Sequence, residues 1–281
     1  MTLPDHIKQS LADKGYDVVH ADQVSGGDIN QARRLTTSTG QRYFLKYNTS
    51  PQGAGLLTSE LRGIQLLEKS NHPTVFSRAY DFDIDTPYLL LDWIDSSKRS
   101  DEKLAIALHE LHRTSGHAYG LDYTSHIGSL EKPGGWRQSF STFYTELRIG
   151  PLLRMVFDQG YRVRVGLEDF ERLITSEFPV ESPSLIHGDL WSGNLIDGDQ
   201  GPIFIDPSVE YAHREMDLAM MRLFGGFSSD VLALYNDRFP LEKGWEERAD
   251  LLQLFYLLVH LHLFGGSYFD SVDRIVKKYL D

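Results

Sequence analysis

The order of its predicted elements is the feature that most limits how this chain can fold. Over the first 95 residues, strand patterns mix with one clear helix pattern, whereas after Ser96 almost every periodic segment is helical. This change predicts an α+β fold of two lobes. We expect residues 1–95 to form a small lobe with an antiparallel sheet and a helix, and residues 96–281 to form a larger, mostly helical lobe.

Individual segments support this division. In the first part, residues 17–37 suggest two strands around a Gly-Gly turn, and residues 41–48 and 87–94 suggest a third and a fourth strand. Residues 56–69 have apolar side chains at helical spacing. In the second part, helices are predicted around residues 101–114, 138–158, 167–178, 215–224, 230–238, 246–264 and 270–280. Residues 194–198 and 202–206 read as a short hairpin joined by the turn DGDQG.

Charge and composition exclude several kinds of function. The net charge of −12 disfavours nucleic acid and anionic membranes as partners. The absence of cysteine excludes disulfides, thiolate nucleophiles and cysteine-bound zinc. The N-terminus has no signal-peptide pattern, and the most apolar segment, residues 251–264, is too short for a membrane span. We therefore expect a cytoplasmic protein, either monomer or dimer.

Chemistry concentrates in the stretch HGDLWSGN, residues 187–194. Asp189 and Asn194 are five positions apart on a loop, and the predicted hairpin returns Asp206 close to Asn194. Hard oxygen ligands of this kind suit Mg²⁺, which takes its remaining ligands from water and substrate phosphates. The spacing D-x-x-x-x-N followed by a later Asp is that of a kinase catalytic loop and its metal-binding aspartate.

Each residue of this loop then has a predicted task. Asp189 accepts the proton of the attacking hydroxyl, while Asn194 and Asp206 hold Mg²⁺. His187 orients the loop backbone, and the glycines permit tight turns. A bare His-x-Asp is most often structural or incidental, so the prediction depends on the whole set of residues.

The small lobe supplies candidate nucleotide-binding residues. Lys46 lies on a predicted strand and Glu60 on the following helix, the arrangement that positions ATP phosphates in kinases. Gly26 and Gly27 lie where a phosphate-covering loop is expected. Taken singly, Lys46 could be a solvated strand lysine, Glu60 an exposed helix acid and the glycines a plain hairpin turn.

The junction between the lobes and the helix start at residue 215 add four further candidate residues. Asp92, Trp93 and Ile94 fall where an adenine would meet backbone groups, although the segment could equally be a buried strand leading into a linker. Asp217 either favours the helix dipole or anchors the catalytic loop through backbone N–H groups.

Several motifs together make the chain resemble the fructosamine/ketosamine-3-kinases, within the protein-kinase-like superfamily near the aminoglycoside and choline phosphotransferases. The resemblance runs over nearly the whole chain, through GGDINQA, YFLKYN, HGDLWSGN, FIDPSVEYAHREMDLAM, LFGGF and LHLFGGSY. HGD-x-x-x-x-N is shared by the superfamily, whereas the Trp of HGDLWSGN, the IDP and the AHRE narrow it to this family. The chain departs from protein kinases at Pro207, which follows the metal aspartate in place of Phe-Gly.

The resemblance implies a protein-kinase-like fold and an ATP- and Mg²⁺-dependent activity. The implied reaction is phosphorylation of the 3-hydroxyl of a ketosamine, a sugar on a lysine amine, in a small molecule or a protein. Loss of the unstable 3-phosphate would free the amine, which is a deglycation role. Ribulosyl- or erythrulosyl-lysine is the implied acceptor before fructosyl-lysine, with Trp191 lining the sugar pocket.

Two alternatives stay open at this point. A related phosphotransferase acting on an aminoglycoside- or choline-like acceptor would also suit an acidic protein. A nucleotide-binding scaffold without activity would have no need of Lys46, Glu60, Asp189, Asn194 and Asp206 together.

Overall fold

The N-terminal part is built on one antiparallel sheet. The computed structural model describes residues 3–24, 29–70 and 77–280. Five strands pair in the order β1-β2-β3-β5-β4, all antiparallel. They are β1 (Val18–Gln23), β2 (Gln31–Thr37), β3 (Arg42–Tyr47), β4 (Ala79–Asp83) and β5 (Tyr88–Asp92). The strands predicted within residues 17–37, 41–48 and 87–94 are confirmed, and the edge strand β4 was not predicted.

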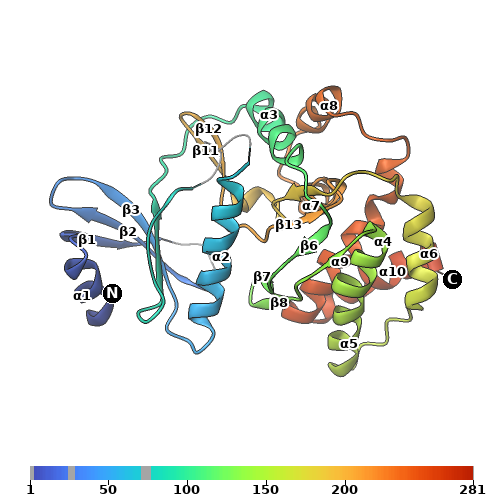
Figure 1. The fold of residues 1–281 in the computed structure, drawn as a ribbon, viewed down its shortest axis with the longest axis horizontal. Coiled ribbons are helices and arrows are strands. Elements are labelled where there is room, and N and C mark those ends of the chain that lie inside the picture. The colour runs from blue at the N-terminus through green and yellow to red at the C-terminus, as the bar shows by residue number, and fades with distance from the viewer. Residues whose placement is uncertain (1–2, 25–28, 71–76, 281) are drawn as a thin grey trace.

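Two helices cover opposite faces of this sheet. Helix α1 (Asp5–Asp13) packs Ile7 and Leu11 on one face, against side chains such as Leu90. Helix α2 (Gly53–Leu67) packs Leu57 and Ile64 on the other face, against β5. Side chains alternate along a strand, so a strand buried on both faces is apolar at successive positions, as β5 is from Tyr88 to Leu91. Figure 1 shows α2 between the sheet and the rest of the molecule.

The remaining chain is mostly helical and forms the larger lobe. Its helices are α3 (Asp101–His112), α4 (Phe140–Phe143), α5 (Gly150–Asp158), α6 (Leu167–Glu177), α7 (Glu215–Phe224), α8 (Ser229–Arg238), α9 (Trp245–Phe264) and α10 (Phe269–Leu280). Helix α9 is buried over most of its length in the largest core, which explains its continuous apolar run. The two-lobed, mixed α+β fold expected from the order of elements is confirmed (Figure 1).

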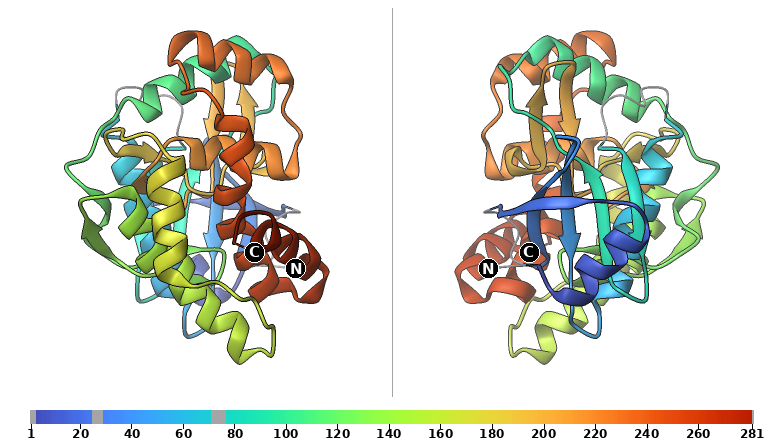
Figure 2. Two further views of the ribbon diagram at one scale, coloured as in Figure 1. Left: turned by 90° about the vertical axis from the view of Figure 1, so that its right-hand side faces the viewer. Right: turned by 90° about the vertical axis from the view of Figure 1, so that its left-hand side faces the viewer.

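Short strands join these helices and were mostly not predicted. A four-stranded sheet has the order β10-β13-β6-β9, and two hairpins, β7–β8 and β11–β12, stand apart from it. The strands are β6 (Tyr119–Leu121), β7 (Ser125–Ile127), β8 (Leu130–Lys132), β9 (Gly135–Arg137), β10 (Ser184–Ile186), β11 (Leu195–Gly198), β12 (Gly201–Phe204) and β13 (Glu210–Ala212). The predicted β11–β12 hairpin is confirmed and lies beside α3 (Figures 1 and 2).

One predicted helix is not continuous. The segment 138–158 divides into α4, a π-helix η2 (Tyr144–Ile149) and α5. A π-helix is closed by i→i+5 hydrogen bonds, so the chain stays helical through this segment but with wider turns than the prediction assumed.

Within the described part of the chain, no helix combines the length and the apolar character that crossing a membrane requires.

Candidate active site

The catalytic loop predicted from HGDLWSGN connects β10 to the β11–β12 hairpin. The Asn194 amide nitrogen donates to the Asp189 backbone carbonyl at 2.8 Å and to its carboxylate at 3.0 Å. The half-buried Asp189 carboxylate is poorly solvated, and burial raises its pKa to about 7 although the Asn194 hydrogen bond acts in the opposite direction. Asp189 can therefore exchange a proton near neutral pH, as a general base must.

Asp206 follows the hairpin and lies close to the loop. The Ile205 backbone N–H donates to the Asn194 carbonyl at 3.0 Å, which brings the two segments together as predicted. The prediction that Asp206 ends the second strand is wrong, because β12 ends at Phe204. Asp206 has φ +54°, alone among the non-glycine residues that the structure describes, and this left-handed backbone cannot continue a strand.

Lys46 joins the two lobes at this point. Its ammonium lies 2.6 Å from a Glu60 carboxylate oxygen and also forms an ion pair with Asp206. Burial alone would lower the pKa of Lys46, but the two carboxylates outweigh burial and raise it above its usual value. The pKa of Glu60 is raised by burial, against the effect of Lys46. The structure thus brings Lys46, Glu60 and Asp206 into one cluster, in which the Lys46 side chain is buried and Asp206 is partly exposed.

The donor set at the loop fits a magnesium ion. Because the Asn194 amide nitrogen donates to Asp189, its amide oxygen is left for a cation. Asp206 contributes a carboxylate that is 41% exposed on the open side of the cluster. In residues 3–24, 29–70 and 77–280, no three His, Cys, Asp or Glu side chains gather as a metal site. Mg²⁺ needs only one or two protein carboxylates when phosphates and water complete its shell, so the set suits Mg²⁺ bound with a nucleotide.

His187 lies beneath the loop and is fully buried. Its Nδ1 accepts from the Asp189 backbone N–H at 3.3 Å, and its Nε2 lies 2.9 Å from the Ile205 carbonyl. Burial lowers the pKa of His187, so the ring is neutral with its proton on Nε2. This geometry suits the predicted role of orienting the backbone.

Asp217 holds the loop from the other side. Its carboxylate accepts the backbone N–H groups of His187 at 2.7 Å and of Gly188 at 2.8 Å. Burial acts to raise the pKa of Asp217. Opposing effects, of which the hydrogen bond and the charge of His112 are the largest, outweigh burial and lower this pKa. Of the two interpretations of Asp217, the structure supports the loop anchor.

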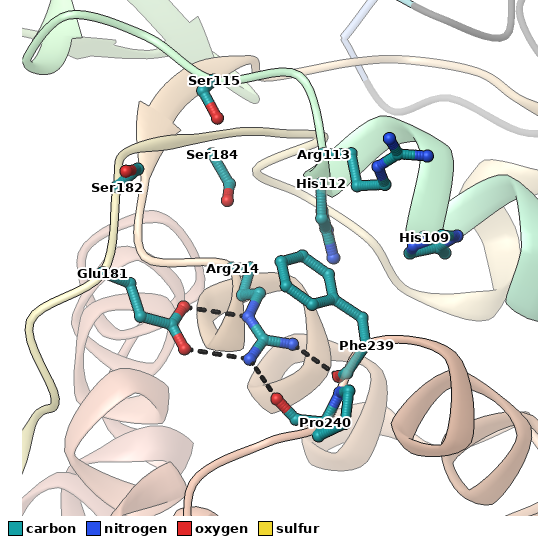
Figure 3. Close-up of a pocket in the computed structure, with 10 residues that line it drawn as sticks. All are labelled: His109, His112, Arg113, Ser115, Glu181, Ser182, Ser184, Arg214, Phe239 and Pro240. Carbon is teal, nitrogen blue, oxygen red and sulfur yellow. Dashed lines mark hydrogen bonds and ion pairs between the residues drawn. The ribbon is translucent and has the colours of Figure 1, made fainter.

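A hydrogen-bond chain extends from Asp217 to a separate cavity. His112 lies 3.2 Å from Asp217 and 2.8 Å from the Tyr235 hydroxyl, which in turn accepts from Arg214 at 3.2 Å. Figure 3 shows Arg214 in the wall of this cavity, where it also donates to Glu181 and to the carbonyls of Phe239 and Pro240. The cavity measures about 520 Å³, and neither Asp189 nor Asp206 lines it. The N–H groups of buried Arg214 all have hydrogen-bond partners already. We therefore assign this cavity a structural role behind the catalytic loop.

The two glycines of the loop, Gly188 and Gly193, are each needed for a different structural reason. Gly188 has φ +79°, and a Cβ there would lie 2.0 Å from the Ser208 carbonyl oxygen. At Gly193, a Cβ would lie 2.1 Å from the Trp191 ring, so its absence makes room for that ring rather than for a left-handed turn. Trp191 is 41% exposed, which leaves part of its surface for a ligand.

The remaining predicted positions are placed less tightly. Asp92 ends β5, and its carboxylate accepts the Arg78 backbone N–H at 3.3 Å. Trp93 donates from its indole nitrogen to Asp95, and Ile94 lies near the β11–β12 hairpin at Gly198. Gly26 and Gly27, the predicted phosphate-covering turn, lie outside the described residues.

Helix α2 contacts residues 206–209, here called the metal-site segment because it carries the candidate metal ligand Asp206, and this contact was not predicted. A Cβ on Gly63 would lie 3.4 Å from Pro207 and 3.5 Å from Val209, so the helix that carries Glu60 packs directly on the residues after Asp206. In the sequence, only Pro207 marked this segment as unusual. A glycine inside a helix does not reveal which residues pack against it.

Comparison with protein families and relatives gives one consistent result. The family model described as fructosamine kinase matches residues 2–281. A probable ketoamine kinase of Lactiplantibacillus plantarum is 37% identical over 271 residues, covering 94% of this chain and 95% of the relative. One of Enterococcus faecium is 35% identical over 267 residues, covering 91% and 94%. A chloroplastic protein-ribulosamine 3-kinase of Arabidopsis thaliana is 30% identical over 279 residues, covering 95% and 84%.

Solved structures agree with these relatives. A putative fructosamine-3-kinase from Thermobifida fusca has a TM-score of 0.85 at 28% identity, with 99% of each chain covered. A choline kinase of Streptococcus pneumoniae has a TM-score of 0.63 at 18% identity, covering 97% of each chain. An ADP-bound aminoglycoside phosphotransferase has a TM-score of 0.64 at 13% identity, covering 98% of this chain and 97% of the other. The last two are similar in fold alone.

Proposed function

Because this chain belongs to the fructosamine kinase family, and is therefore a phosphotransferase, we propose that it uses ATP to phosphorylate the 3-hydroxyl of ketosamines on lysine. The cluster in which Lys46 contacts both Glu60 and Asp206 is the observation that carries the proposal. It supports the proposal because Lys46, the candidate phosphate-binding cation, reaches Asp206 beside the loop that holds Asp189 and Asn194. In this proposal residues 1–95 bind the nucleotide and residues 96–281 bind the acceptor.

Asp189 is the general base of the proposed reaction. Its carboxylate, fixed by Asn194, accepts the proton of the sugar 3-hydroxyl while that oxygen bonds to the γ-phosphorus and ADP leaves. A pKa of about 7 keeps a large part of Asp189 ionised in neutral solution. His187, which is buried and neutral, positions this loop and transfers no proton.

The negative charge of the nucleotide is proposed to be bound or neutralised through three residues, Lys46, Asn194 and Asp206. Lys46 binds the phosphates, and its pairing with Glu60 keeps the ammonium pointed into the site. Asn194 and Asp206 would hold Mg²⁺, which neutralises the phosphate oxygens when it is bound. Asp92, Trp93 and Ile94 are proposed to contact the adenine at the junction.

Trp191 is proposed to line the acceptor pocket. Its partly exposed ring offers an apolar face to sugar C–H groups and a π face to the cationic amine of the ketosamine. We propose ribulosyl- or erythrulosyl-lysine as acceptor before fructosyl-lysine, free or within a protein. Loss of the unstable 3-phosphate from the product then frees the lysine, which makes the role deglycation in the cytoplasm.

A labelled-phosphate panel tests this assignment. The protein is incubated with Mg²⁺ and γ-labelled ATP and with ribulosyl-lysine, erythrulosyl-lysine, fructosyl-lysine, choline or kanamycin. Transfer to a ketosamine, with the phosphate located on O3 by mass spectrometry and NMR, is the expected result. Transfer only to choline or kanamycin would replace the acceptor class, and no transfer to any compound would favour a nucleotide-binding scaffold.

A further inference from the structure

A buried lysine in the larger lobe touches the backbone of the metal-site segment, outside every motif discussed so far. Taking the proposed phosphate transfer as given, we propose that Lys132 is a positioning residue for it. The ammonium of Lys132 holds the Ser208 carbonyl, and thereby the backbone that carries Asp206, against the catalytic loop.

Lys132 ends β8 and is only 2% exposed. Its ammonium donates to the Ser208 backbone carbonyl at 2.6 Å and lies 3.3 Å from a Glu210 carboxylate oxygen. Burying an ammonium is strongly unfavourable unless partners replace its lost water. A methionine or leucine could fill the same volume without that penalty, so the charge calls for a specific explanation.

Lys132 contacts the segment that carries Asp206, the proposed metal ligand. Asp206 has a left-handed backbone, which an L-residue adopts only when its surroundings hold it there. Two residues later, the Ser208 N–H donates to the His187 carbonyl at 2.9 Å, and the Ser208 hydroxyl donates to the His126 carbonyl at 2.7 Å. The bond from Lys132 is the third tether on Ser208, and the β7–β8 hairpin supplies two of the three.

Lys132 also lies where this segment meets the catalytic loop. A Cβ on Gly188 would be 2.0 Å from the Ser208 carbonyl oxygen and 3.5 Å from the Lys132 ammonium. The carbonyl is therefore pressed against the loop one residue before Asp189, with the lysine beside the contact. Loss of the hydrogen bond between Lys132 and Ser208 would therefore shift both Asp189 and Asp206.

The surrounding charges do not cancel within the cluster. Arg148, on the π-helix η2, forms a buried ion pair with Glu210 and donates at 3.0 Å to the Pro133 carbonyl. Two cations and one carboxylate leave one positive charge, and the Asp189 carboxylate is among the groups that interact with Lys132. Burial lowers the pKa of Lys132 to about 8, against the effect of Glu210, so the ammonium is still charged at neutral pH.

A simpler explanation is that Lys132 only supplies a charge that neutralises Glu210, and two neutral substitutions separate the two explanations. Lys132→Met removes both the charge and the N–H donor, whereas Lys132→Gln removes the charge and keeps a donor; exposed Lys8→Met is the matched control. Glu210 is left in place because Arg148 also pairs with it. If only the charge matters, the two Lys132 variants are impaired equally. If Lys132 positions the Ser208 carbonyl, Lys132→Gln is impaired less than Lys132→Met.

Two readouts are taken on each variant after its fold is checked by circular dichroism. The first is kcat and KM with the best ketosamine, and the second is ADP affinity with and without Mg²⁺ by calorimetry. We expect Lys132→Met to lower kcat, and the gain in ADP affinity due to Mg²⁺, by about 10- to 100-fold, with little change in acceptor KM. Lys132→Gln, which keeps a donor, is expected to retain more of both and serves if the Met variant does not fold.

Equal impairment of the Met and Gln variants would overturn the proposal, as would wild-type values for both Lys132 variants in both readouts. The ADP measurement needs no acceptor. If wild-type protein phosphorylates nothing in the panel, the proposed function fails while the calorimetry still decides the role of Lys132.

Discussion

At the scale of single residues, the site depends on how burial changes the ionisation of a few side chains. Asp189 is the clearest case, because its carboxylate is fixed by Asn194 and its pKa is raised to about 7. The same burial that suits it to proton transfer makes its charged form unfavourable for folding. Activity and stability are therefore expected to respond in opposite directions when this charge is removed.

Replacing Asp189 by Asn is expected to lower kcat by about 10²–10⁴-fold, because a positioned base is lost while the loop keeps its shape. In the wild type, the base must be ionised, so kcat should rise with pH through the pKa of about 7 and then level off. Steady-state assays between pH 5.5 and 8.5 measure both effects. Near wild-type turnover of the variant, or a flat pH profile, would contradict the role of Asp189.

The same variant is expected to be more stable than the wild type at pH 8. Asp189 has a folded pKa of about 7 against an ordinary value of 3.8, so the folded state favours its protonated form. That contribution is complete below the ordinary value, shrinks as pH rises, and is lost above the folded pKa. Denaturant unfolding should show a gain for Asp189→Asn that is larger at pH 8 than at pH 5 by on the order of 2–3 kcal/mol. An equal gain at both pH values would show that ionisation is not its cause.

At the scale of elements, the sequence predicted α2 and the helices of the larger lobe and missed α1. Helix α1 spans nine residues and buries only Ile7 and Leu11, so it offers a single apolar pair. The three-residue strands β6 to β10 are too short to show alternation. The residues of the catalytic loop were found because their spacing is short, whereas Lys132 and Gly63 act through distant partners that no local pattern reveals.

The contact of α2 with the metal-site segment leads to a prediction. Gly63→Leu adds a side chain where only about one methyl group fits against Pro207. It should displace α2, weaken the Lys46–Glu60 pair and raise the KM for ATP. Gly55→Leu is the matched control, since it lies on the same helix with open space around it. Equal ATP kinetics for the two variants would show that this contact does not position Glu60.

At the scale of the whole molecule, the two lobes were predicted from the change in element pattern, but the bond between them was not. The Lys46–Asp206 ion pair joins residues 160 positions apart, and no spacing rule reaches that distance. Lys46–Glu60, only 14 positions apart, was within reach of such a rule. Candidate residues for the site could therefore be proposed from the sequence, whereas the contact between Lys46 and Asp206 is seen only in the folded structure.

Nucleotide binding between the lobes should stabilise the molecule as a whole. ATP with Mg²⁺ at about 100 times its dissociation constant is expected to raise the melting temperature by on the order of 5 °C. The shift should be much smaller when EDTA replaces Mg²⁺, because Asn194 and Asp206 then lose the cation that links them to the phosphates. Differential scanning fluorimetry measures both arms. An unchanged shift in EDTA would argue against these two residues as metal ligands.

The separation of Lys46 from Asp206 along the chain also concerns how the protein acquires activity. Each lobe contains hairpins and helix pairs whose contacts close over short loops. The Lys46–Asp206 ion pair, in contrast, can form only after both lobes have folded and docked. Catalytic competence is then a late event in folding. By the same reasoning, mild denaturant should abolish activity before it melts the helices, as local opening at the lobe junction precedes global unfolding.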